Sequence, residues 1–332
     1  MIHDNGRILE AVLSVLLEAG RPLGSTAIAA ELELAGIGLK ERMIRYYLSR
    51  TDALGFTENL GRAGRRLTPA GEERLRKVVA VGKVSLISAR MDDLAYRMSF
   101  DPSRMSGTVG VNLTRIDTAA LPEASRLITE VLDAGFGMGR FFKAGRDGEE
   151  LAGYAPRHGE VAVATVCSVA LTGVLFAAGI PVQPRFGGLL ELREGKPVRF
   201  THAIHYEGTT IDPVEVFIKG RMTSVREAVA TGTGTIGASF REIPVSALPA
   251  ASTLMERLTA IGLLGRVHLV GRPGQPLLDI PVPQGKAGVV VTAGLNAIAA
   301  VEEAGIETRT VPMASLLDFT HLAEVPSGPE ST

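Results

Sequence analysis

Arginine side chains are the main chemistry-bearing residues in the first part of the chain, and they recur in two short stretches. One is a run with helical periodicity at 39–56, and the other is the Gly-containing turn GRAGR at 61–65. Guanidinium groups contact base edges in a duplex groove and neutralise phosphates. Between Lys40 and Lys77 the chain holds 10 basic and 5 acidic side chains, although its overall net charge is -1. We therefore expect this region to meet a polyanion.

The elements that position these arginines are predicted to be three helices and a hairpin. Apolar residues at helical spacing over 8–16 predict a first helix, which ends at Gly20-Arg21-Pro22. Ser25 is expected to cap a second helix, and the run at 39–56 predicts a third that lacks a Ser, Thr or Asp cap. FTENL and RLT then flank the turn as a hairpin, and Thr68-Pro69 begins a fourth helix. Helices followed by an arginine-tipped hairpin indicate a winged helix.

The third predicted helix has one apolar face and one basic face. Ile44, Tyr47, Leu48 and Thr51 are expected in the core. The expected DNA-contacting residues are Lys40, Arg42, Arg45, Tyr46, Ser49 and Arg50 on the helix, with Arg62, Arg65 and Arg66 at the hairpin tip. Any one of these arginines taken alone would be read as a solvated surface charge, so the prediction depends on the order of the elements together with the position of the charge.

The rest of the chain contains an internal duplication. GTVGVNLTRI (107–116) matches GTIGASFREI (234–243), and ALPEASRL (120–127) matches ALPAASTL (247–254), both at an offset of 127. At an offset of 126, GRFFKAGR (139–146) matches GRVHLVGR (265–272). Matches that keep their order with one small shift indicate two copies of one unit.

Each copy is predicted to run strand, proline-started helix, strand, loop, strand, helix, strand, which is typical of an α/β fold. The expected fold class is an α+β N-terminal winged helix followed by an α/β regulatory domain built from two internally repeated lobes. The expected boundaries are 1–80 for the winged helix, 81–105 for a connecting helix or linker, 106–322 for the regulatory domain and 323–332 for a flexible tail. The lobes are placed at 106–182 and 233–312. An insert at 183–232 holds a hairpin turning at 194–196 and a helix opened by Ser224-x-x-Glu227.

Two repeated lobes are expected to bind a small ligand between them, and a ligand with two similar ends would suit such a cleft. A predicted helix begins near Val166-Cys167-Ser168 in the first copy and near Ala293-Gly294 in the second. Helix N-termini favour carboxylates. The expected effector-binding residues are Thr165, Cys167, Ser168, Arg185, Thr292 and Gly294, with Arg199 a further source of charge. The alternative for the hydroxyls is that they only cap their helices, and for the arginines that they lie on the surface.

Several strings of residues resemble the NrpR family of nitrogen-regulation repressors. In the first domain they are RPLGSTAIAAEL, ERMIRYYL and GRAGRRLTPAGEE; in the second they are TVCSVALTGVLFAAGIPV, YEGTTIDPVEVFIKGRMTSVREA and TGTGTIGASFREIP. The resemblance implies a repressor of nitrogen-assimilation genes that releases its operator when 2-oxoglutarate binds the regulatory domain. It implies no other cofactor. Some family members carry two regulatory domains, whereas one is expected here, and Met43 stands where such helices often have a small polar residue.

Two further signals are weighed against this interpretation. Gly232-Thr-Gly234-Thr-Ile-Gly237 fits the dinucleotide pattern G-x-G-x-x-G, but a helix is predicted before it and a strand after it, which is the reverse of what that site needs. Cys167 is the single cysteine and is predicted at a helix start, so an enzyme with a DNA-binding appendage centred on Cys167 is one alternative function. The other alternative is a winged-helix regulator that senses another small acid. His202 and His205 fall on opposite faces of a strand, which disfavours a shared metal.

The composition limits the remaining classes of protein. One cysteine allows neither a disulfide framework nor a structural zinc site, and no apolar run reaches about eighteen residues, the length that a membrane span needs. The start of the chain does not match a signal peptide. We expect a cytoplasmic regulator, not an enzyme, whose partners are double-stranded operator DNA, a small dicarboxylate and further copies of itself in a homodimer or higher homo-oligomer, with no membrane.

Overall fold

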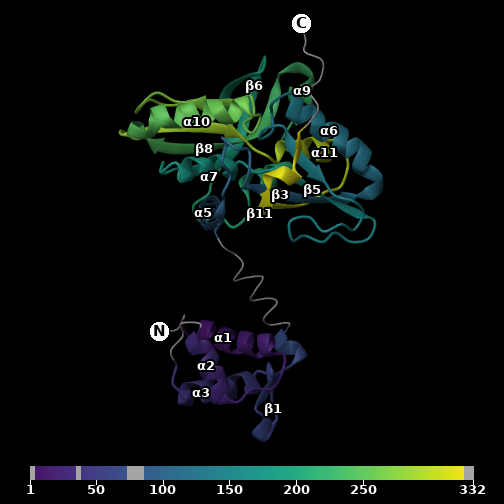
Figure 1. Cartoon of the computed structure of the whole chain (residues 1–332), viewed down its shortest axis with the longest axis vertical. Coiled ribbons are helices and arrows are strands. Elements are labelled where there is room, and N and C mark those ends of the chain that lie inside the picture. Colours follow the sequence, from purple (N-terminus) through teal and green to yellow (C-terminus); the bar gives the residue numbers. More distant parts are fainter. Residues whose placement is uncertain (1–3, 35–38, 73–85, 325–332) are drawn as a thin grey trace. The chain divides into compact units, whose positions relative to one another are not determined.

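The chain folds into two units, each with its own hydrophobic core. A computed structural model describes residues 4–34, 39–72 and 86–324. The first unit spans Met1–Ser85 and the second spans Leu86–Thr332 (Figure 1). The elements of the first unit are α1 (Asp4–Ala19), α2 (Ser25–Leu34), α3 (Glu41–Ala53), β1 (Thr57–Asn59) and β2 (Arg65–Leu67). This order of helices and a final hairpin confirms the predicted winged helix.

The core of the first unit forms where the apolar stripes of its three helices meet. Leu13 of α1, Ile28 of α2 and Leu48 of α3 are fully buried there. One prediction about these helices is wrong in detail. Ser25 does not precede α2 but is its first residue, and its hydroxyl donates to Glu41 Oε1 at 2.9 Å, which joins α2 to the start of α3.

The predicted fourth helix begins where the sequence placed it. The Gly71 amide donates to Thr68 Oγ1 at 3.1 Å, so Thr68 caps a helix that starts at Pro69. The helix is described as far as Glu72, and its predicted continuation lies outside the described residues.

The second unit contains both repeats. Its elements in chain order are α5 (Ile87–Arg97), β3 (Thr108–Asp117), α6 (Leu121–Asp133), β4 (Phe141–Ala144), β5 (Glu160–Val166), α7 (Val169–Ala177), β6 (Gln183–Arg193), β7 (Lys196–His205), α8 (Pro213–Lys219), α9 (Val225–Thr231), β8 (Gly234–Pro244), α10 (Leu248–Ala260), β9 (His268–Val270), β10 (Lys286–Thr292), α11 (Asn296–Glu303), β11 (Arg309–Asp318) and β12 (Ala323–Glu324). The run β3-α6-β4-β5-α7-β6 is repeated as β8-α10-β9-β10-α11-β11. This repetition confirms the predicted order of elements in each copy.

The two repeats exchange their last strands. One sheet has the order β7-β6-β8-β10-β9 and the other β11-β3-β5-β4-β12. Strand β6 closes the first repeat but pairs with β8 of the second, and β11 closes the second repeat but pairs with β3 of the first. Each five-stranded sheet is therefore completed by the other copy. The two repeated lobes are present, but the first extends beyond its expected end at 182, because residues 183–193, which we assigned to the insert, form its exchanged last strand.

The helices also pair across the repeats. Helix α6 of the first repeat packs with α11 of the second, and α7 of the first packs with α10 of the second (Figure 1). The α6–α11 pair shares a core with Ile116 and Val163, while the α7–α10 pair shares a core with Ile243 and Val289. The two strand-to-helix junctions of the repeats are thus held within one folded unit.

The edges of the second unit differ from the expected boundaries. Helix α5, which we placed in a connecting segment, packs on α7 and is part of this unit. Residues 323–324, which we placed in the tail, form β12 and pair with β4. The predicted hairpin turn lies at Glu194–Gly195, between β6 and β7, as expected. The rest of the predicted tail, 325–332, lies outside the described residues.

Candidate functional site

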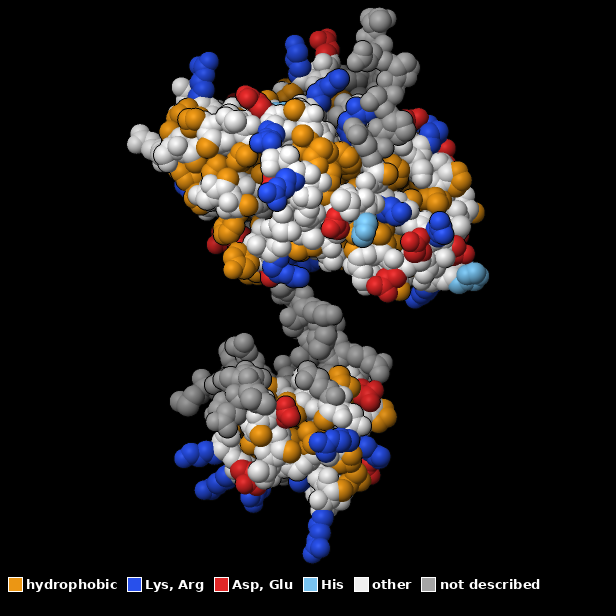
Figure 2. Space-filling view, in the orientation of Figure 1, with side chains coloured by type: hydrophobic (Ala, Val, Ile, Leu, Met, Phe, Trp, Pro, Cys, Tyr) orange, Lys and Arg blue, Asp and Glu red, His pale blue; other side chains and the backbone are white. Residues whose placement is uncertain are grey.

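The outer face of α3 carries the basic residues that the sequence placed there. Lys40, Arg42, Arg45, Tyr46, Ser49 and Arg50 are all exposed, whereas Ile44, Tyr47, Leu48 and Thr51 are buried. Figure 2 shows Lys and Arg side chains projecting from the first unit over α3 and the hairpin. A solvent-facing helix with this charge has the dimensions and chemistry to enter a major groove.

Neighbouring side chains hold some of these groups in place. Arg45 Nη2 donates to Glu41 Oε1 at 2.7 Å one turn earlier, and this hydrogen bond lowers the pKa of the Glu41 carboxyl. The Arg50 guanidinium lies 6.0 Å from the centre of the Tyr46 ring. Arg42 has no ion pair with any described residue. Arg42 is therefore the α3 arginine most ready to meet a base or phosphate.

The hairpin does not place its three predicted arginines together. Arg62 is exposed at the tip, between the two strands. Arg66 is exposed on β2 and pairs with Glu58 at 2.8 Å. Arg65 is half-buried and its Nε donates to Asp52 Oδ2 of α3 at 3.2 Å, so the expectation that Arg65 lies at the tip is wrong. Alternation along a strand places 65 and 66 on opposite faces, a signal that could have separated them.

A glycine fixes the end of the hairpin turn, directly before β2. Gly64 has φ +97°, and a Cβ at this residue would stand 2.3 Å from the Leu23 carbonyl oxygen. The chain before α2 runs beside β2 here, because Leu23 and Arg65 exchange backbone hydrogen bonds of 3.0 and 2.9 Å. The hairpin is therefore anchored to the helices, which holds Arg62 at a fixed place relative to α3.

The two strand-to-helix junctions of the second unit meet each other. A Cβ on Gly294, before α11, would stand 1.9 Å from the Val166 carbonyl oxygen and 3.0 Å from Asn112 Nδ2. The same backbone bond recurs in both repeats: Cys167 N donates to Gly110 O, and Ala293 N donates to Gly237 O, each at 2.9 Å. The sequence-predicted residues of the two junctions are thus brought together.

The predicted hydroxyl groups do not cap their helices. Thr165 is buried and accepts a hydrogen bond of 3.4 Å from Asn112 Nδ2. Thr292 is buried and donates to the Gly137 carbonyl oxygen at 2.8 Å. Ser168 stands at the N-cap position of α7, but its hydroxyl makes no capping bond to the helix. The alternative that these hydroxyls serve as helix caps is therefore wrong.

Ser168 instead accepts hydrogen bonds from a buried arginine. Arg241 Nη2 donates to the Ser168 carbonyl oxygen at 2.9 Å and to Ser168 Oγ at 3.0 Å. Arg241 is 0% exposed, and its Nε and Nη1 have no hydrogen-bond partner among the described residues. A buried guanidinium with unsatisfied N–H groups is costly, and an anion placed against it would remove that cost.

Cys167 and Tyr206 lie near enough to this arginine for its charge to act on their pKa values, and the charge of Asp212 acts on both of them in turn. We call Cys167, Ser168, Tyr206, Asp212 and Arg241 the junction cluster. Burial raises the pKa of Cys167 to about 11, so the thiol is protonated at neutral pH. Burial, followed by the Asp212 charge, raises the pKa of Tyr206. Loss of hydration also raises the pKa of Asp212, although backbone N–H groups of Glu215 and Val214 and the charge of Arg90 oppose this. The Asp212 carboxylate accepts from the Val214 and Glu215 amides at 2.9 and 3.1 Å and forms no ion pair with Arg241.

The two arginines proposed from the insert are engaged elsewhere. Arg185 forms an ion pair with Glu242, whose side chain is 2% exposed. Arg199 is exposed on β7 and pairs with Glu191 at 2.8 Å. Both guanidinium groups therefore pair with a carboxylate, whereas Arg241 bonds only to Ser168 and forms no ion pair with a described residue.

Sequence reasoning missed the residues that shape this site most. Asn296 holds the second junction, since its Oδ1 accepts from Gly237 N at 2.7 Å and its Nδ2 donates to Phe136 O at 2.7 Å. Asn112 and Arg241 were also missed. The repeat does contain one sign of Arg241. At an offset of 127 its counterpart in the first copy is the neutral Thr114, so Arg241 is a charged residue at a position where the other copy has none, and the neighbouring inward-facing residues of its strand are small or apolar.

The structure also describes the G-x-G-x-x-G string and the two histidines, which the sequence disfavoured as a dinucleotide site and a metal site. Gly232 ends α9 with φ +75° and Gly234 begins β8, so a helix precedes the G-x-G-x-x-G string and a strand follows it, as predicted. His202 and His205 are both exposed on β7. Across residues 4–34, 39–72 and 86–324, no three His, Cys, Asp or Glu side chains gather in a way that would hold a metal ion. Helices within the same ranges are too short or too polar to cross a bilayer.

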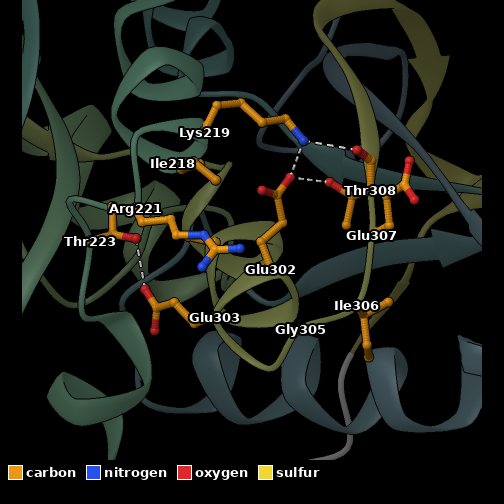
Figure 3. A pocket seen from close by; sticks show the side chains of 11 residues that line it. Ile218, Lys219, Arg221, Thr223, Glu302, Glu303, Gly305, Ile306, Glu307 and Thr308 are labelled. Carbon is orange, nitrogen blue, oxygen red and sulfur yellow. Dashed lines mark hydrogen bonds and ion pairs between the residues drawn. The ribbon is translucent and has the colours of Figure 1, made fainter.

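A pocket of about 540 Å³ lies at the C-terminal ends of α8 and α11, away from the junction residues (Figure 3). Lys219 pairs with Glu302 and donates to the Thr308 carbonyl oxygen at 2.8 Å. Glu303 accepts from Thr223 Oγ1 at 2.7 Å and from the backbone of Val225 at 2.8 Å. Most of the charged groups in this pocket therefore hold the insert on α11.

The same contacts correct the predicted capping box of α9. Ser224 stands at the N-cap as expected but makes no side-chain cap. Glu303 takes that role, because its two carboxylate oxygens accept from the Val225 and Arg226 amides at 2.8 and 2.9 Å. The cap that the sequence placed within the insert thus comes from the second repeat.

Comparison with known proteins places both units. Residues 84–324 match the family described as NrpR regulatory domains NRD1 and 2, and residues 10–75 match the Ribonuclease R winged-helix domain. The chain is 35% identical over 322 residues to Global nitrogen regulator NrpRI of Methanosarcina mazei, covering 96% of this chain and 98% of that protein. It is 26% identical to Global nitrogen regulator NrpR of Methanococcus maripaludis, over 96% of this chain and 55% of that one.

A solved structure supports the same assignment. The crystal structure of a nitrogen repressor-like protein from Methanococcus jannaschii is similar with a TM-score of 0.62 and 25% identity, over 73% of this chain and 99% of that chain. A winged helix followed by this duplicated α/β unit is thus found in a chain whose relatives are named nitrogen regulators. The chain belongs to the NrpR family of nitrogen regulators.

Proposed function

We propose that the protein represses nitrogen-assimilation genes by binding an operator through its winged helix and releases that operator when 2-oxoglutarate binds the junction cluster. The observation that carries the effector half of this proposal is Arg241, a fully buried guanidinium with two nitrogen atoms that lack a partner in the described part of the chain. The protein would act in the cytoplasm with no other cofactor.

The DNA half of the proposal is supported by the outer face of α3 and the hairpin tip. Arg42, Arg45 and Arg50 point to solvent from one helix, and Arg62 is exposed at the end of the anchored hairpin. In this arrangement α3 reads base edges and the hairpin contacts phosphates. A twofold dimer of the chain would present two α3 helices to a palindromic operator.

The effector half is supported by the chemistry of the junction. A carboxylate of 2-oxoglutarate would supply acceptors for Arg241 Nε and Nη1. The second carboxylate would meet the opposite junction, where Gly294 and Thr292 lie at the end of β10 and before α11. Because Arg241 is fully enclosed, the ligand binds best in a rearranged state. A ligand that prefers a state with low operator affinity weakens DNA binding by its difference in affinity for the two states.

The test is a titration of the whole chain with 2-oxoglutarate, followed by thermal unfolding and by operator mobility shift. We expect the melting temperature to rise and the operator to be released over the same range of concentration. Glutarate, which lacks the keto group, and succinate, which is shorter, serve as matched controls. If millimolar 2-oxoglutarate causes no thermal shift and no operator release, 2-oxoglutarate is rejected as the effector. If glutarate or succinate releases the operator instead, that acid replaces 2-oxoglutarate as the effector.

A second candidate is an enzyme centred on Cys167. Its raised pKa argues against a nucleophilic thiolate, because the thiol stays protonated near neutral pH. Substituting Cys167→Ser separates the two functions. A repressor keeps operator binding and effector response, whereas a cysteine enzyme loses turnover.

A further inference from the structure

Helix α5 is the first element of the second unit, and the chain from the winged helix enters that unit through it. The unit begins at Leu86, and α5 spans Ile87–Arg97. One face of α5 is buried through Ile87, Met91, Leu94 and Ala95. The covalent path between the two units therefore passes through a helix with a single docked face.

That docked face covers part of the junction cluster. The buried side chains of α5 form one apolar cluster with Cys167, Val169, Tyr206 and Met313. Cys167 and Tyr206 are members of the junction cluster, and both have their pKa values affected by Arg241. Helix α5 thus packs on two residues of the cluster that contains the fully enclosed Arg241.

A single arginine fastens α5 to an irregular part of β11. Arg90 Nη2 donates to the carbonyl oxygens of Pro312 and Met313 at 2.7 and 3.2 Å. The register of β11 against β3 shifts between Val311 and Ser315, and Met313 has φ +48°, a left-handed conformation that is unusual for this residue type. Such a bulge presents carbonyl oxygens away from the sheet, where they accept hydrogen bonds from Arg90.

The bulge is in turn bonded to the first junction. The Met313 amide donates to Asn112 Oδ1 at 3.1 Å, and Asn112 Nδ2 donates to Thr165 Oγ1 at 3.4 Å. A chain of hydrogen bonds therefore runs from α5 through Arg90, the bulge and Asn112 to the end of β5. Another bond joins the start of α5 to the segment before α8, where the Ile87 amide donates to Thr209 O at 2.9 Å.

We propose that α5 is the coupling helix of the protein, and that Arg90 is the positioning residue that keeps it docked in the operator-binding state. Entry of an acidic effector to Arg241 undocks α5 and breaks the Arg90 bonds to Pro312 and Met313. Undocking changes the point at which the chain from the winged helix is held, and so lowers operator affinity. This inference rests on the proposed function, because it requires that operator binding and effector binding oppose each other.

The first test compares Arg90→Ala with Arg97→Ala in the whole chain. Arg97 lies on the exposed side of the same helix and pairs with Asp93 at 3.0 Å, so its substitution removes an arginine from α5 without touching β11. Arg90→Ala should lower the 2-oxoglutarate concentration for half-release of the operator by about tenfold, since charge-assisted hydrogen bonds of this kind no longer oppose undocking. It should also weaken operator binding without effector. Arg97→Ala should change neither.

A merely structural role for Arg90 would give a different pattern. In that case Arg90→Ala would lower the melting temperature but leave the half-release concentration as in the unsubstituted chain, and the coupling role would be rejected. If the unsubstituted chain shows no response to 2-oxoglutarate, the proposed effector fails instead. Operator affinity measured without effector still tests α5 then, because equal affinities for Arg90→Ala and Arg97→Ala would overturn its part in DNA binding.

The second test holds α5 in place. The rings of Tyr96 on α5 and Phe176 on α7 meet with centroids 6.3 Å apart, and both side chains are exposed. The double variant Tyr96→Cys, Phe176→Cys can be joined by a short bismaleimide, while the native Cys167 is buried. The joined protein should bind operator and resist release by 2-oxoglutarate, whereas the same variant before joining should release normally. Release at the same concentration in both forms would show that α5 stays docked.

Discussion

Gly294 and Val166 bring the two repeats into contact at the point where each changes from strand to helix. The Val166 carbonyl oxygen occupies the space that a side chain on Gly294 would need, with only 1.9 Å to the position of a Cβ. The contact joins the end of β5 to the segment before α11. A change at either residue therefore acts on both halves of the proposed effector site.

Substituting Gly294→Ala should destabilise the second unit by about 3 kcal/mol or more, because backbone atoms of two packed elements must separate. Thermal unfolding measures the effect, and the response to 2-oxoglutarate should weaken with it. Gly24→Ala is the control, since a Cβ there meets nothing within 4 Å. A melting temperature that is equally unchanged in both variants would contradict the packing.

Substituting Arg241→Met should remove the effector response without lowering the stability of the free protein. The substitution replaces a buried cation that has unsatisfied N–H groups by an apolar side chain of similar length, which is often neutral or stabilising. Arg185→Met is the matched comparison, because it leaves the buried carboxylate of Glu242 without its partner and should cost about 3 kcal/mol. Thermal unfolding with and without 2-oxoglutarate checks both. An effector shift retained by Arg241→Met would exclude Arg241 as the anion site.

Substituting Arg45→Ala should weaken specific operator binding by about 1–3 kcal/mol if the side chain contacts a base. The Arg45 side chain is exposed, and its guanidinium pairs with Glu41 one turn earlier on the helix. The variant therefore also loses this Arg45–Glu41 ion pair. Mobility shifts with operator and with unrelated DNA separate base reading from general attraction. Arg97→Ala is a suitable control because it removes a similar pair on α5. Equal losses for both DNA sequences would mean that Arg45 contacts only phosphate.

Arg62 and Arg65 should behave differently, although they lie three residues apart. Arg62→Ala should weaken binding to all sequences and reduce the slope of log affinity against log salt by about 1, as expected for a phosphate contact. Arg65→Ala should instead destabilise the first unit by about 1 kcal/mol, because Arg65 joins the hairpin to Asp52 while both side chains remain partly exposed. Thermal unfolding and salt-dependent titrations distinguish the two. A smaller salt slope for Arg65→Ala at unchanged stability would place that residue on the DNA.

Alkylation of Cys167 should be slow in the folded protein and should accelerate as pH rises. Burial raises the thiol pKa to about 11, so the reactive thiolate gains population only as pH approaches that value. Iodoacetamide labelling at several pH values, followed by mass spectrometry, measures the rate. Denatured protein is the control, and its labelling should reach half-maximum at about pH 8.5. Rapid labelling of folded protein at pH 7 would revive the enzyme hypothesis.

The parts of the fold that local sequence controls were predictable. In α3 the helical period alone separates the buried Ile44 and Tyr47 from the exposed Arg42 and Arg45, because neighbours on one helix face are three or four residues apart. The order of strands and helices in each repeat was predictable for the same reason. The duplication itself identified the two junctions that meet at Gly294.

The parts that depend on distant partners were not predictable. Strands β6 and β11 have the same apolar alternation whichever sheet they join, so their exchange between repeats leaves no local sign. Arg241 and Arg65 are charged residues in strands, and only the surrounding structure determines that Arg241 is enclosed and that Arg65 faces Asp52. A charged side chain is usually exposed, and this general tendency is misleading at sites where charge is buried for a purpose.

The exchange of β6 and β11 has a consequence for how the protein is made. Thr114 on β3 bonds to Thr310 on β11 at 3.0 Å, although Thr310 stands 196 positions further along the chain. The sheet that contains β3 therefore cannot be complete until residues 309–318 have been synthesised. The winged helix, whose contacts are all local, can fold long before its control unit does. During synthesis each nascent chain thus passes through a period in which its first unit is folded and its second unit is still incomplete.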